Sequence, residues 1–386
     1  MVPNGDGWDV SYKQGSEEGT EKFDYVVVST GMYSLPNIPK FPDQDKFKGE
    51  VMHAEGFTDG AQAKGKKVVV VGGGKSAVDC AVVAGNNGVS STLLFRSAHW
   101  PCARHLAGFV PLGWYAYTRF CLFMLPTHYD VSPAFRFMHT ALSPLKWVWW
   151  RTAELILILQ YGLKGDRIPK YPLEIDVFSG GQILNYDYRD ALKAGTVQDK
   201  LGAIDKFVED GVILKDGTKL EADMVVFATG FTKSYDYFDE ATTKALDKQK
   251  DGLYLYRQIV PPNVNNLAFI GSEMSTFNNI LTQGLQTLWL EKVLKGDLEL
   301  PSKETMLERM EEEKAWKRSW MPPTSSRAAI FQLHKTNYHD QLMRDMGEPH
   351  RRKGLNFLAE VFAPYSARDY EGLFKREHRQ PQQQQA

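Results

Sequence analysis

The sequence predicts an α/β fold built around parallel sheets, and two observations support this prediction. The first is a weak internal repeat, because residues 23–34 and 222–234 both contain an Asp, an unbroken apolar run and then Thr-Gly. Unbroken apolar runs are typical of strands covered on both faces, as in parallel sheets. The second is the segment 67–97, which reads as a strand, a glycine-rich turn, a helix and another strand. Such alternation of strands and helices is the pattern of α/β sheets.

Shorter elements flank the two copies of the repeat. Residues 8–22, ahead of the first copy, have strand, turn and strand character. Ahead of the second copy, residues 212–222 predict a hairpin with Asp216-Gly217 as a type I′ turn. Residues 304–318 predict a charged surface helix, and residues 376–386 predict a disordered tail.

The composition is that of an ordinary globular protein. The 386 residues are 43% hydrophobic and 24% charged, and 46 Lys+Arg against 47 Asp+Glu leave a net charge of -1. This balance argues against disorder and against a nucleic-acid-binding protein that depends on basic charge. Cys80, Cys102 and Cys121 are too few for a disulfide framework, so a reducing, cytoplasmic location is expected.

The most hydrophobic region lies between Leu106 and Leu163. Charged residues interrupt it before any uncharged run approaches the roughly 20 residues that span a bilayer, so no transmembrane helix is expected. The first twenty residues contain no apolar run of the kind found in secretory signals. The segment 100–171 is dense in aromatic and basic residues, which can form an ordinary core or lie at a membrane surface.

The glycine-rich turn predicts a dinucleotide-binding site. It follows directly on the valine-rich strand, and the G-x-G-x-x-A pattern falls on Gly72, Gly74 and Ala77. The first glycine permits a tight turn, the second lets a pyrophosphate approach the backbone, and the small Ala77 lets the helix and the strand pack closely. A helix from about Ser76 to Ala84 would direct its N-terminal N–H groups at the phosphates. The Gly-Asn-Asn-Gly that follows predicts its end.

The residue after the second strand favours NADP over NAD. NAD sites usually place an acidic residue there to hold the ribose 2′-OH, whereas this chain has Arg96. A guanidinium can bind the 2′-phosphate of NADP through charge-assisted hydrogen bonds. Lys75 can add positive charge to the turn, and Gly73 and Ser76 complete the predicted phosphate site. The alternatives are a solvated charge at Arg96 and a purely structural glycine turn.

Together these features resemble the flavin-containing monooxygenases, which are class B flavoprotein monooxygenases with two dinucleotide-binding domains. The segment FKGEVMHAEGF matches the fingerprint F-x-G-x-x-x-H-x-x-x-[FYW] of that family at Phe47, Gly49, His53 and Phe57. The resemblance implies that His53 belongs to the interdomain linker and the NADP site and is not a catalytic base. The Baeyer–Villiger branch usually has Trp and then Pro or Asp at the last position, so Phe57 followed by Thr58 favours the N- and S-oxygenating branch.

The resemblance also implies an order of domains along the chain. Residues 1–45 would be a remnant of the FAD domain, 46–65 the linker, 66–220 the NADPH domain with a helical aromatic insertion at about 100–171, 221–300 the return to the FAD domain, and 301–375 a C-terminal helical region. Further cofactor-binding residues are expected after the two repeat strands and on a late helix, at Thr30, Gly31, Thr229, Gly230, Phe231 and Gln286.

We expect the FAD domain to be incomplete at its N-terminus. The family has a second G-x-G-x-x-G well ahead of the first repeat strand, but only 22 residues precede Phe23 here. An incomplete sequence, a split protein whose other chain supplies the FAD turn, and a flavin-free descendant would each explain this. An incomplete sequence is the favoured explanation.

The resemblance implies NADPH- and FAD-dependent oxygenation of soft N- or S-containing small molecules. NADPH reduces FAD, the reduced flavin takes up O2 as a C4a-hydroperoxide, and the substrate attacks its distal oxygen. Because the cofactors carry this chemistry, we assign no catalytic residue and no metal ligand. The alternatives are a Baeyer–Villiger monooxygenase and a flavin-free NADP-binding or interaction module.

Overall fold

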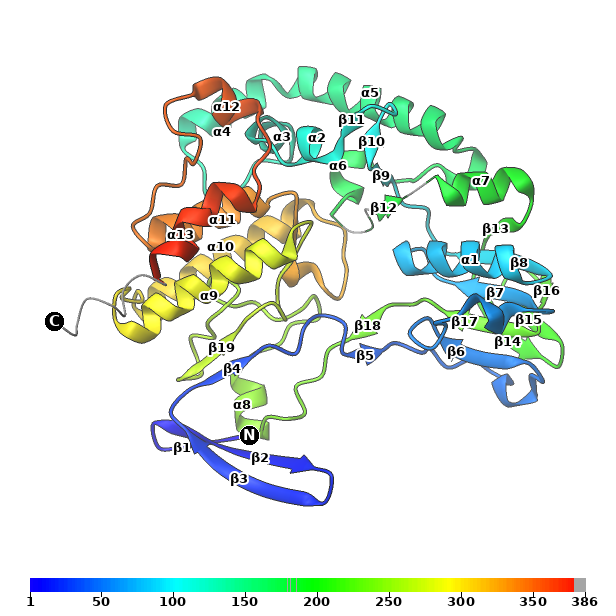
Figure 1. The fold of residues 1–386 in the computed structure, drawn as a ribbon, viewed down its shortest axis with the longest axis horizontal. Coiled ribbons are helices and arrows are strands. Elements are labelled where there is room, and N and C mark those ends of the chain that lie inside the picture. Colours follow the sequence, from blue (N-terminus) through cyan, green and yellow to red (C-terminus); the bar gives the residue numbers. More distant parts are fainter. Residues whose placement is uncertain (179, 181, 185, 378–386) are drawn as a thin grey trace. The chain divides into compact units, whose positions relative to one another are not determined.

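The computed structural model describes residues 1–178, 180, 182–184 and 186–377. The chain forms two compact units (Figure 1). Unit 1 comprises residues 1–32, 113–144 and 234 onward, and unit 2 comprises residues 33–112 and 145–233. This division places residues 113–144 in unit 1, whereas the sequence analysis assigned the whole aromatic segment to the NADPH domain. Most of the tail expected at 376–386 lies outside the described residues.

Unit 2 is built on a sheet of five parallel strands. In spatial order they are β13 (Val197–Leu201), β8 (Ser90–Phe95), β7 (Lys67–Val71), β17 (Met224–Phe227) and β6 (Glu50–His53). The second copy of the repeat forms β17, which is buried along its whole length, as an unbroken apolar run predicts. Phe47, Phe207 and Phe227 pack in the core on one side of this sheet.

Helix α1 (Lys75–Asn87) connects β7 to β8 and packs against both strands. It is longer than predicted, because Gly85 does not end it. A Cβ at Gly85 would lie 2.6 Å from the carbonyl oxygen of Thr196, so glycine is required there by close packing. The helix ends at Gly88, whose N–H donates to the carbonyl of Ala84 at 2.7 Å.

The predicted hairpin is present, but its turn is not of type I′. Strand β15 (Gly211–Leu214) pairs antiparallel with β14 (Ile204–Val208) and β16 (Lys219–Glu221). A type I′ turn needs a positive φ at both central residues, but only Gly217 has one, at +83°. Asp216 instead accepts the N–H of Thr218 with its side chain at 2.9 Å, a local contact that this short acidic side chain makes readily.

Unit 2 also contains several shorter elements. These are β5 (Leu35–Pro36) with β18 (Phe231–Thr232), β9 (Pro101–Ala103) with β12 (Gln182–Leu184), β10 (His105–Leu106) with β11 (Val110–Pro111), and the helices α6 (Leu173–Asp176) and α7 (Asp187–Ala194). Most of the long helix α5 (Ser143–Tyr161) belongs to this unit.

Unit 1 combines three small sheets with most of the helices. Its strands are β1 (Val2–Asn4), β2 (Gly7–Gln14) and β3 (Glu17–Phe23) in an antiparallel sheet, β4 (Val26–Val28) parallel to β19 (Leu267–Phe269), and β20 (Ser275–Thr276) parallel to β21 (Ile330–Gln332). Its helices are α2 (Leu112–Ala116), α3 (Arg119–Met124), α4 (Pro133–Ala141), α8 (Glu240–Ala245), α9 (Asn279–Lys295), α10 (Lys303–Trp320), α11 (Lys335–Asp345), α12 (Phe357–Phe362) and α13 (Glu371–Glu377).

Two predictions for unit 1 need correction. The first copy of the repeat forms β4, but this strand is not covered on both faces, since Val27 is 43% exposed. Among the described strands β4 pairs only with β19, so it lacks the neighbours that bury β17. The predicted surface helix is α10, yet one face of it lies inside the unit, where Glu313 and Lys317 are buried.

Candidate dinucleotide-binding site

The glycine turn lies where the chain of unit 2 changes direction across its sheet. Strand β7 is central, β8 follows it on one side, and β17 arrives on the other side from much later in the chain. In parallel α/β sheets the crevice at the carboxyl ends of two such strands is the usual ligand site. Gly72 has a φ of +153°, and a Cβ there would lie 2.3 Å from the carbonyl oxygen of Ala228. Only glycine fits between these two strand ends.

The second glycine has a different surrounding. Gly74 is the N-cap of α1, it is exposed, and a Cβ there would meet no atom of the described residues within 4 Å. The backbone is therefore open on this side, above the free N–H groups of the first helical turn. Such a helix end attracts anions through its N–H groups and its dipole. Ser76 is exposed on this turn, Ala77 is fully buried against the strand, and Lys75 forms an ion pair with Asp79.

Arg96 lies immediately after β8, where the sequence predicted a ligand for the 2′-phosphate. Its side chain is exposed and forms no ion pair with any residue that the structure describes. An exposed guanidinium without a carboxylate partner keeps all of its N–H donors available for an anion.

The loop after Arg96 is held by a buried carboxylate that the sequence analysis did not identify. Asp176 is 1% exposed, and its two oxygens contact Nδ1 of His99 at 2.9 Å and the backbone N–H of Trp100 at 2.7 Å. No sequence pattern relates His99 to Asp176, which follows 77 residues later. This contact could therefore not be predicted from the sequence.

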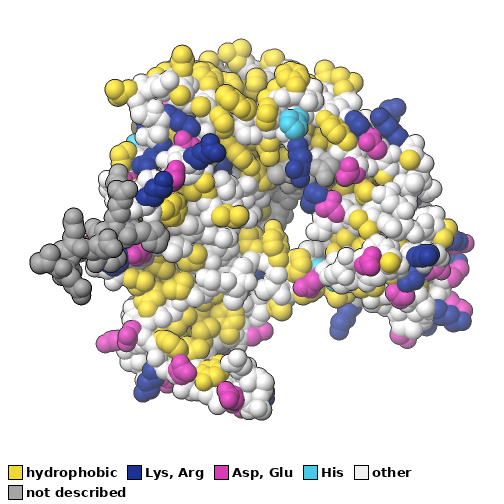
Figure 2. Space-filling model, viewed as in Figure 1, with side chains coloured by type: hydrophobic (Ala, Val, Ile, Leu, Met, Phe, Trp, Pro, Cys, Tyr) yellow, Lys and Arg dark blue, Asp and Glu magenta, His cyan; other side chains and the backbone are white. Residues whose placement is uncertain are grey.

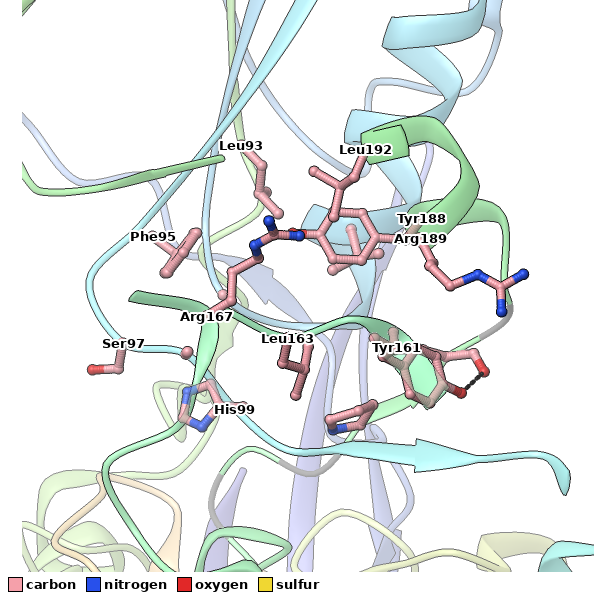
Figure 3. Close-up of a pocket in the computed structure, with 15 residues that line it drawn as sticks. Leu93, Phe95, Ser97, His99, Tyr161, Leu163, Arg167, Tyr188, Arg189 and Leu192 are labelled. Carbon is pink, nitrogen blue, oxygen red and sulfur yellow. Dashed lines mark hydrogen bonds between the residues drawn. The ribbon is translucent and has the colours of Figure 1, made fainter. Parts of the chain in front are cut away.

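A small pocket adjoins the turn and the end of β8 (Figure 3). Gly73, Phe95, Ser97 and His99 line one part of it, and side chains of α7, the end of α5 and the segment after it line much of the rest. Its volume is about 50 Å³, well below the roughly 300–1,000 Å³ of sites that enclose a small molecule. A nucleotide bound at this turn would therefore lie on the surface at the strand end rather than inside this pocket.

The carboxylate of Asp199, beside the pocket, has partners within the protein, although its Oδ2 makes no hydrogen bond to a described residue. Asp199 accepts the hydroxyl of Tyr188 at 2.6 Å and forms an ion pair with Arg167 at 3.2 Å. Burial raises the pKa of Asp199 above its ordinary value, and its hydrogen bond to Tyr188 opposes this effect. This group therefore holds α7 against β13 and gives no sign of a catalytic role.

His53 lies at the end of β6 and ties the linker to the return strand. Its Nε2 is 2.9 Å from the carbonyl oxygen of Gly230, so this nitrogen carries the hydrogen and donates. Its Nδ1 accepts the N–H of Glu55 at 3.2 Å, and its ring packs edge-on against Phe231. Because backbone groups occupy both nitrogens, the geometry fits a linker residue. Thr229 donates its hydroxyl to the carbonyl of Asn37 in the same connection.

The remaining predicted residues belong to unit 1. Gly31 follows β4 with a φ of +75°, and the hydroxyl of Thr30 bonds to Tyr237. Gln286 on α9 is fully buried, where its Oε1 accepts the N–H of Gly271 at 3.1 Å and its Nε2 donates to Tyr338 at 2.8 Å. This carboxamide has both ends committed inside the protein.

The two predicted cofactors fit the described residues differently. NADP fits unit 2, because an open glycine turn, a free helix N-terminus and an unpaired arginine occur on neighbouring strand ends. For FAD, the described residues contain no second glycine turn that opens a helix directly after a parallel strand. They therefore do not form a pyrophosphate site for FAD by themselves.

Comparison with known proteins identifies the class to which this architecture belongs. The profile of the flavin-binding monooxygenase-like family matches residues 3–350, so the chain belongs to that family. It is 28% identical over 404 residues to the probable flavin-containing monooxygenase 1 of Arabidopsis thaliana, with 96% of this chain and 73% of that protein covered. It is 28% identical over 345 residues to human flavin-containing monooxygenase 3, with 88% of this chain covered and 60% of that protein.

Solved structures of flavoprotein monooxygenases share the fold. Cyclohexanone monooxygenase from Rhodococcus sp. Phi1, bound to NADP+, superposes with a TM-score of 0.62 at 16% identity over 88% of this chain and 75% of that one. The S-allyl-L-cysteine S-oxygenase of Allium sativum superposes with a TM-score of 0.54 at 17% identity over 99% of this chain and 65% of that one. At these identities the likeness concerns the fold. The chain spans about 60% of the length of the mammalian relatives.

Proposed function

We propose that the protein takes part in NADPH- and FAD-dependent oxygenation of small molecules with a soft nitrogen or sulfur nucleophile, using O2. Family membership and the fold support the flavoprotein monooxygenase class. Phe57 followed by Thr58 supports N- or S-oxygenation. Baeyer–Villiger enzymes are among the structural neighbours, so conversion of a ketone to an ester is the second candidate. Product analysis with a tertiary amine and with a cyclic ketone, in the presence of FAD, distinguishes the two.

The NADP site is the observation that supports this proposal most directly. When bound, NADPH supplies a hydride, and the residues of this chain only hold it in place. The N–H groups at the start of α1 bind the pyrophosphate across the open side of Gly74, and Arg96 binds the 2′-phosphate. The FAD pyrophosphate requires residues other than those described. A flavin-free NADP-binding module remains the alternative from another class, and the flavin absorbance of the purified chain, with and without added FAD, tests it.

Replacement of Arg96 by alanine tests the cofactor assignment. We expect NADPH affinity to fall by about 1.5–3 kcal/mol, because a charge-assisted contact to the 2′-phosphate is lost, while NADH affinity stays the same. Fluorescence titration of the reduced nucleotides measures both. Arg104→Ala is the matched control, since Arg104 is another exposed arginine of unit 2. Equal losses for NADPH and NADH would contradict the assignment.

We also propose a cytoplasmic protein with peripheral membrane contact through α5. Leu145, Val148, Leu155 and Leu159 lie on one side of this helix at heptad spacing and are 54–74% exposed. The charged residues of the helix turn inward, where Arg151 pairs with Glu154 and Glu174. Trp150, Leu157 and Tyr161 of the same helix are buried, so α5 is apolar on its exposed face as well as on its buried face, unlike an ordinary surface helix. Figure 2 shows hydrophobic side chains gathered over α5. None of the described helices is long and apolar enough to cross a bilayer.

Other aromatic side chains extend this apolar face. Trp147 and Trp149 are 61% and 43% exposed on α5, and tryptophan favours membrane interfaces. Phe109 is 74% exposed between β10 and β11, a hairpin that Gln160 joins to α5 through bonds to Ala107 and His105.

Flotation with vesicles of phosphatidylcholine and phosphatidylserine tests the membrane proposal. The wild-type chain should float with the vesicles at low salt, and the double variant Val148→Ser/Leu155→Ser should stay at the bottom of the gradient because its apolar face is interrupted. Val89→Ser removes an equally exposed apolar residue outside α5 and serves as the control. A wild-type chain that does not float would exclude this contact.

A further inference from the structure

Unit 1 encloses a large cavity that plays no part in the NADP site. It lies among α3, α4, α11 and α12, and its volume is about 680 Å³. Helix α3 contacts both α11 and α12, and Figure 1 shows α3, α4 and α12 in one region of the unit. The volume falls within the roughly 300–1,000 Å³ range of sites that enclose drug-sized molecules. The lining residue Phe357 is 70% exposed, so the cavity opens to solvent beside α12.

A cavity of this size is not expected to be empty in the working protein. The cavity opens beside α12, so solvent reaches it when no ligand is bound. An organic ligand therefore competes with water, and the lining decides which of the two is favoured.

The lining is mainly apolar and favours an organic occupant over water. Phe120, Phe123, Phe135, Met138 and Val361 contribute carbon surface from three of the four helices. Phe123 and Phe135 meet edge to face, with ring centroids 5.8 Å apart. Water held against such surface gains few hydrogen bonds, and its displacement by an apolar molecule is favourable.

The charges on the lining are balanced and largely paired with one another. Arg119 makes a two-pronged ion pair with Asp340, at 2.6 and 2.9 Å, and also contacts Glu360. Arg344 pairs with Asp130. The third lining arginine, Arg351, is exposed to solvent. A charged ligand would therefore bring an ion into an apolar space whose enclosed ions already have partners, and that is costly.

Two polar groups on the lining are still available. One is Nε2 of His128, which is buried without a hydrogen-bond partner among the described residues, while its Nδ1 accepts the N–H of Asp130 at 3.3 Å. The other is the side-chain amide of Asn337. The side-chain oxygen of Asn337, on α11, lies 3.3 Å from Nδ1 of His334, and its NH2 group has no acceptor among the described residues. This half-buried donor can satisfy one acceptor on a ligand. We propose that the cavity is a binding site for an uncharged, lipophilic organic molecule of drug-like size that carries a hydrogen-bond acceptor. This proposal is independent of the NADP site.

Titration of the 386-residue chain with Nile red tests the proposal. This uncharged, lipophilic dye carries a carbonyl acceptor, and its fluorescence rises in apolar surroundings. We expect saturable binding that weakens at least tenfold in Met138→Trp and Val361→Trp, which fill the cavity, and about fivefold in Asn337→Leu. Leu294→Trp, at an exposed position of α9 outside the cavity, should bind as the wild type does. Leu155→Ser should leave the saturable binding of Nile red unchanged. This control distinguishes binding in the cavity from binding to the apolar face of α5.

Two results would overturn the proposal. One is unchanged Nile red affinity in the correctly folded variants, checked by far-UV circular dichroism. The other is tighter binding of the anionic dye 1-anilinonaphthalene-8-sulfonate than of Nile red, because a site with paired charges should disfavour an anion. If a tryptophan variant does not fold, Asn337→Leu decides, since it removes a donor without adding bulk to the core.

Discussion

Two glycines of one turn are required for different physical reasons. Gly72 lies between two strand ends, where the carbonyl oxygen of Ala228 leaves no room for a side chain. Gly74 has no neighbour within reach of a Cβ, and its φ of -91° suits any residue. The first glycine therefore serves the fold, and the second leaves space for a ligand.

This difference predicts opposite effects of the same substitution. Gly72→Ala should lower the free energy of unfolding by about 2–3 kcal/mol, because of the close contact and the unfavourable φ. Gly74→Ala should leave stability within about 0.5 kcal/mol and weaken NADPH binding at least tenfold. Urea denaturation and nucleotide titration measure the two effects. Full NADPH affinity in a stable Gly74→Ala protein would contradict the placement of the pyrophosphate.

Lys335 is an unusual buried cation in unit 1. It is 1% exposed, its amino group lies 3.5 Å from the ring centroid of Tyr117, and its Nζ has no hydrogen-bond partner among the residues that the structure describes. Burial lowers the pKa of Lys335 to about 7, and the nearby Cys121 opposes this shift. An unfolded chain restores a lysine pKa near 10.4, so between these values the unfolded state binds more protons than the folded state.

The pH dependence of stability follows from this difference. Protonation of Lys335 costs the most below about pH 7, and the cost disappears as the pH rises toward the unfolded value. Lys335→Met should therefore stabilise the protein by about 2–5 kcal/mol at pH 6, and its advantage should shrink as the pH rises toward 10. Denaturation at several pH values measures this, with the exposed Lys303→Met as the control. A constant difference between wild type and Lys335→Met across this range would exclude Lys335 as the titrating group.

At the level of elements, the sequence predicts best where local pattern and tertiary packing agree. Strand β7 forms where the valine-rich run ahead of the glycine turn predicts a strand, and β17 is buried as its apolar run indicates. Features that depend on distant contacts were not predictable. Gly85 reads as a helix stop, yet it lies within α1 because the carbonyl of Thr196 approaches it. The bond between His99 and Asp176 joins segments with no common pattern.

The orientation of helix α5 is another feature that could not be predicted from the sequence. Its sequence is mostly apolar, with Lys146, Arg151 and Glu154 as its charged residues, and this pattern would also fit a core helix. Only the structure shows that Arg151 and Glu154 turn inward while Leu145, Leu155 and Leu159 are exposed. For the candidate site, the sequence predicts the turn and Arg96 because their chemistry is local, and their role in binding NADP stays a prediction. It did not identify the groups that hold the surrounding loop.

At the level of the whole molecule, the chain passes between the two units at 32/33, 112/113, 144/145 and 233/234. Every residue of the proposed NADP contact belongs to unit 2, including the glycine turn, the start of α1 and Arg96. A ligand stabilises the regions that it contacts, by about 2.7 kcal/mol at a concentration of 100 Kd. The four backbone connections between the units do not by themselves stabilise unit 1 when the nucleotide binds to unit 2.

Hydrogen exchange measured by mass spectrometry tests this separation. With saturating NADP+, peptides from β7, α1 and the end of β8 should exchange more slowly, because their amides are bound or held closed. At 100 Kd the stabilisation of about 2.7 kcal/mol limits this slowing to about a hundredfold. Peptides from α9 and α11 in unit 1 should exchange at the rate of the free protein. Arg96→Ala, at the same NADP+ concentration, should reduce the protection in unit 2. Equal protection in both units would instead mean that the nucleotide couples them, and that the site extends beyond the residues of unit 2.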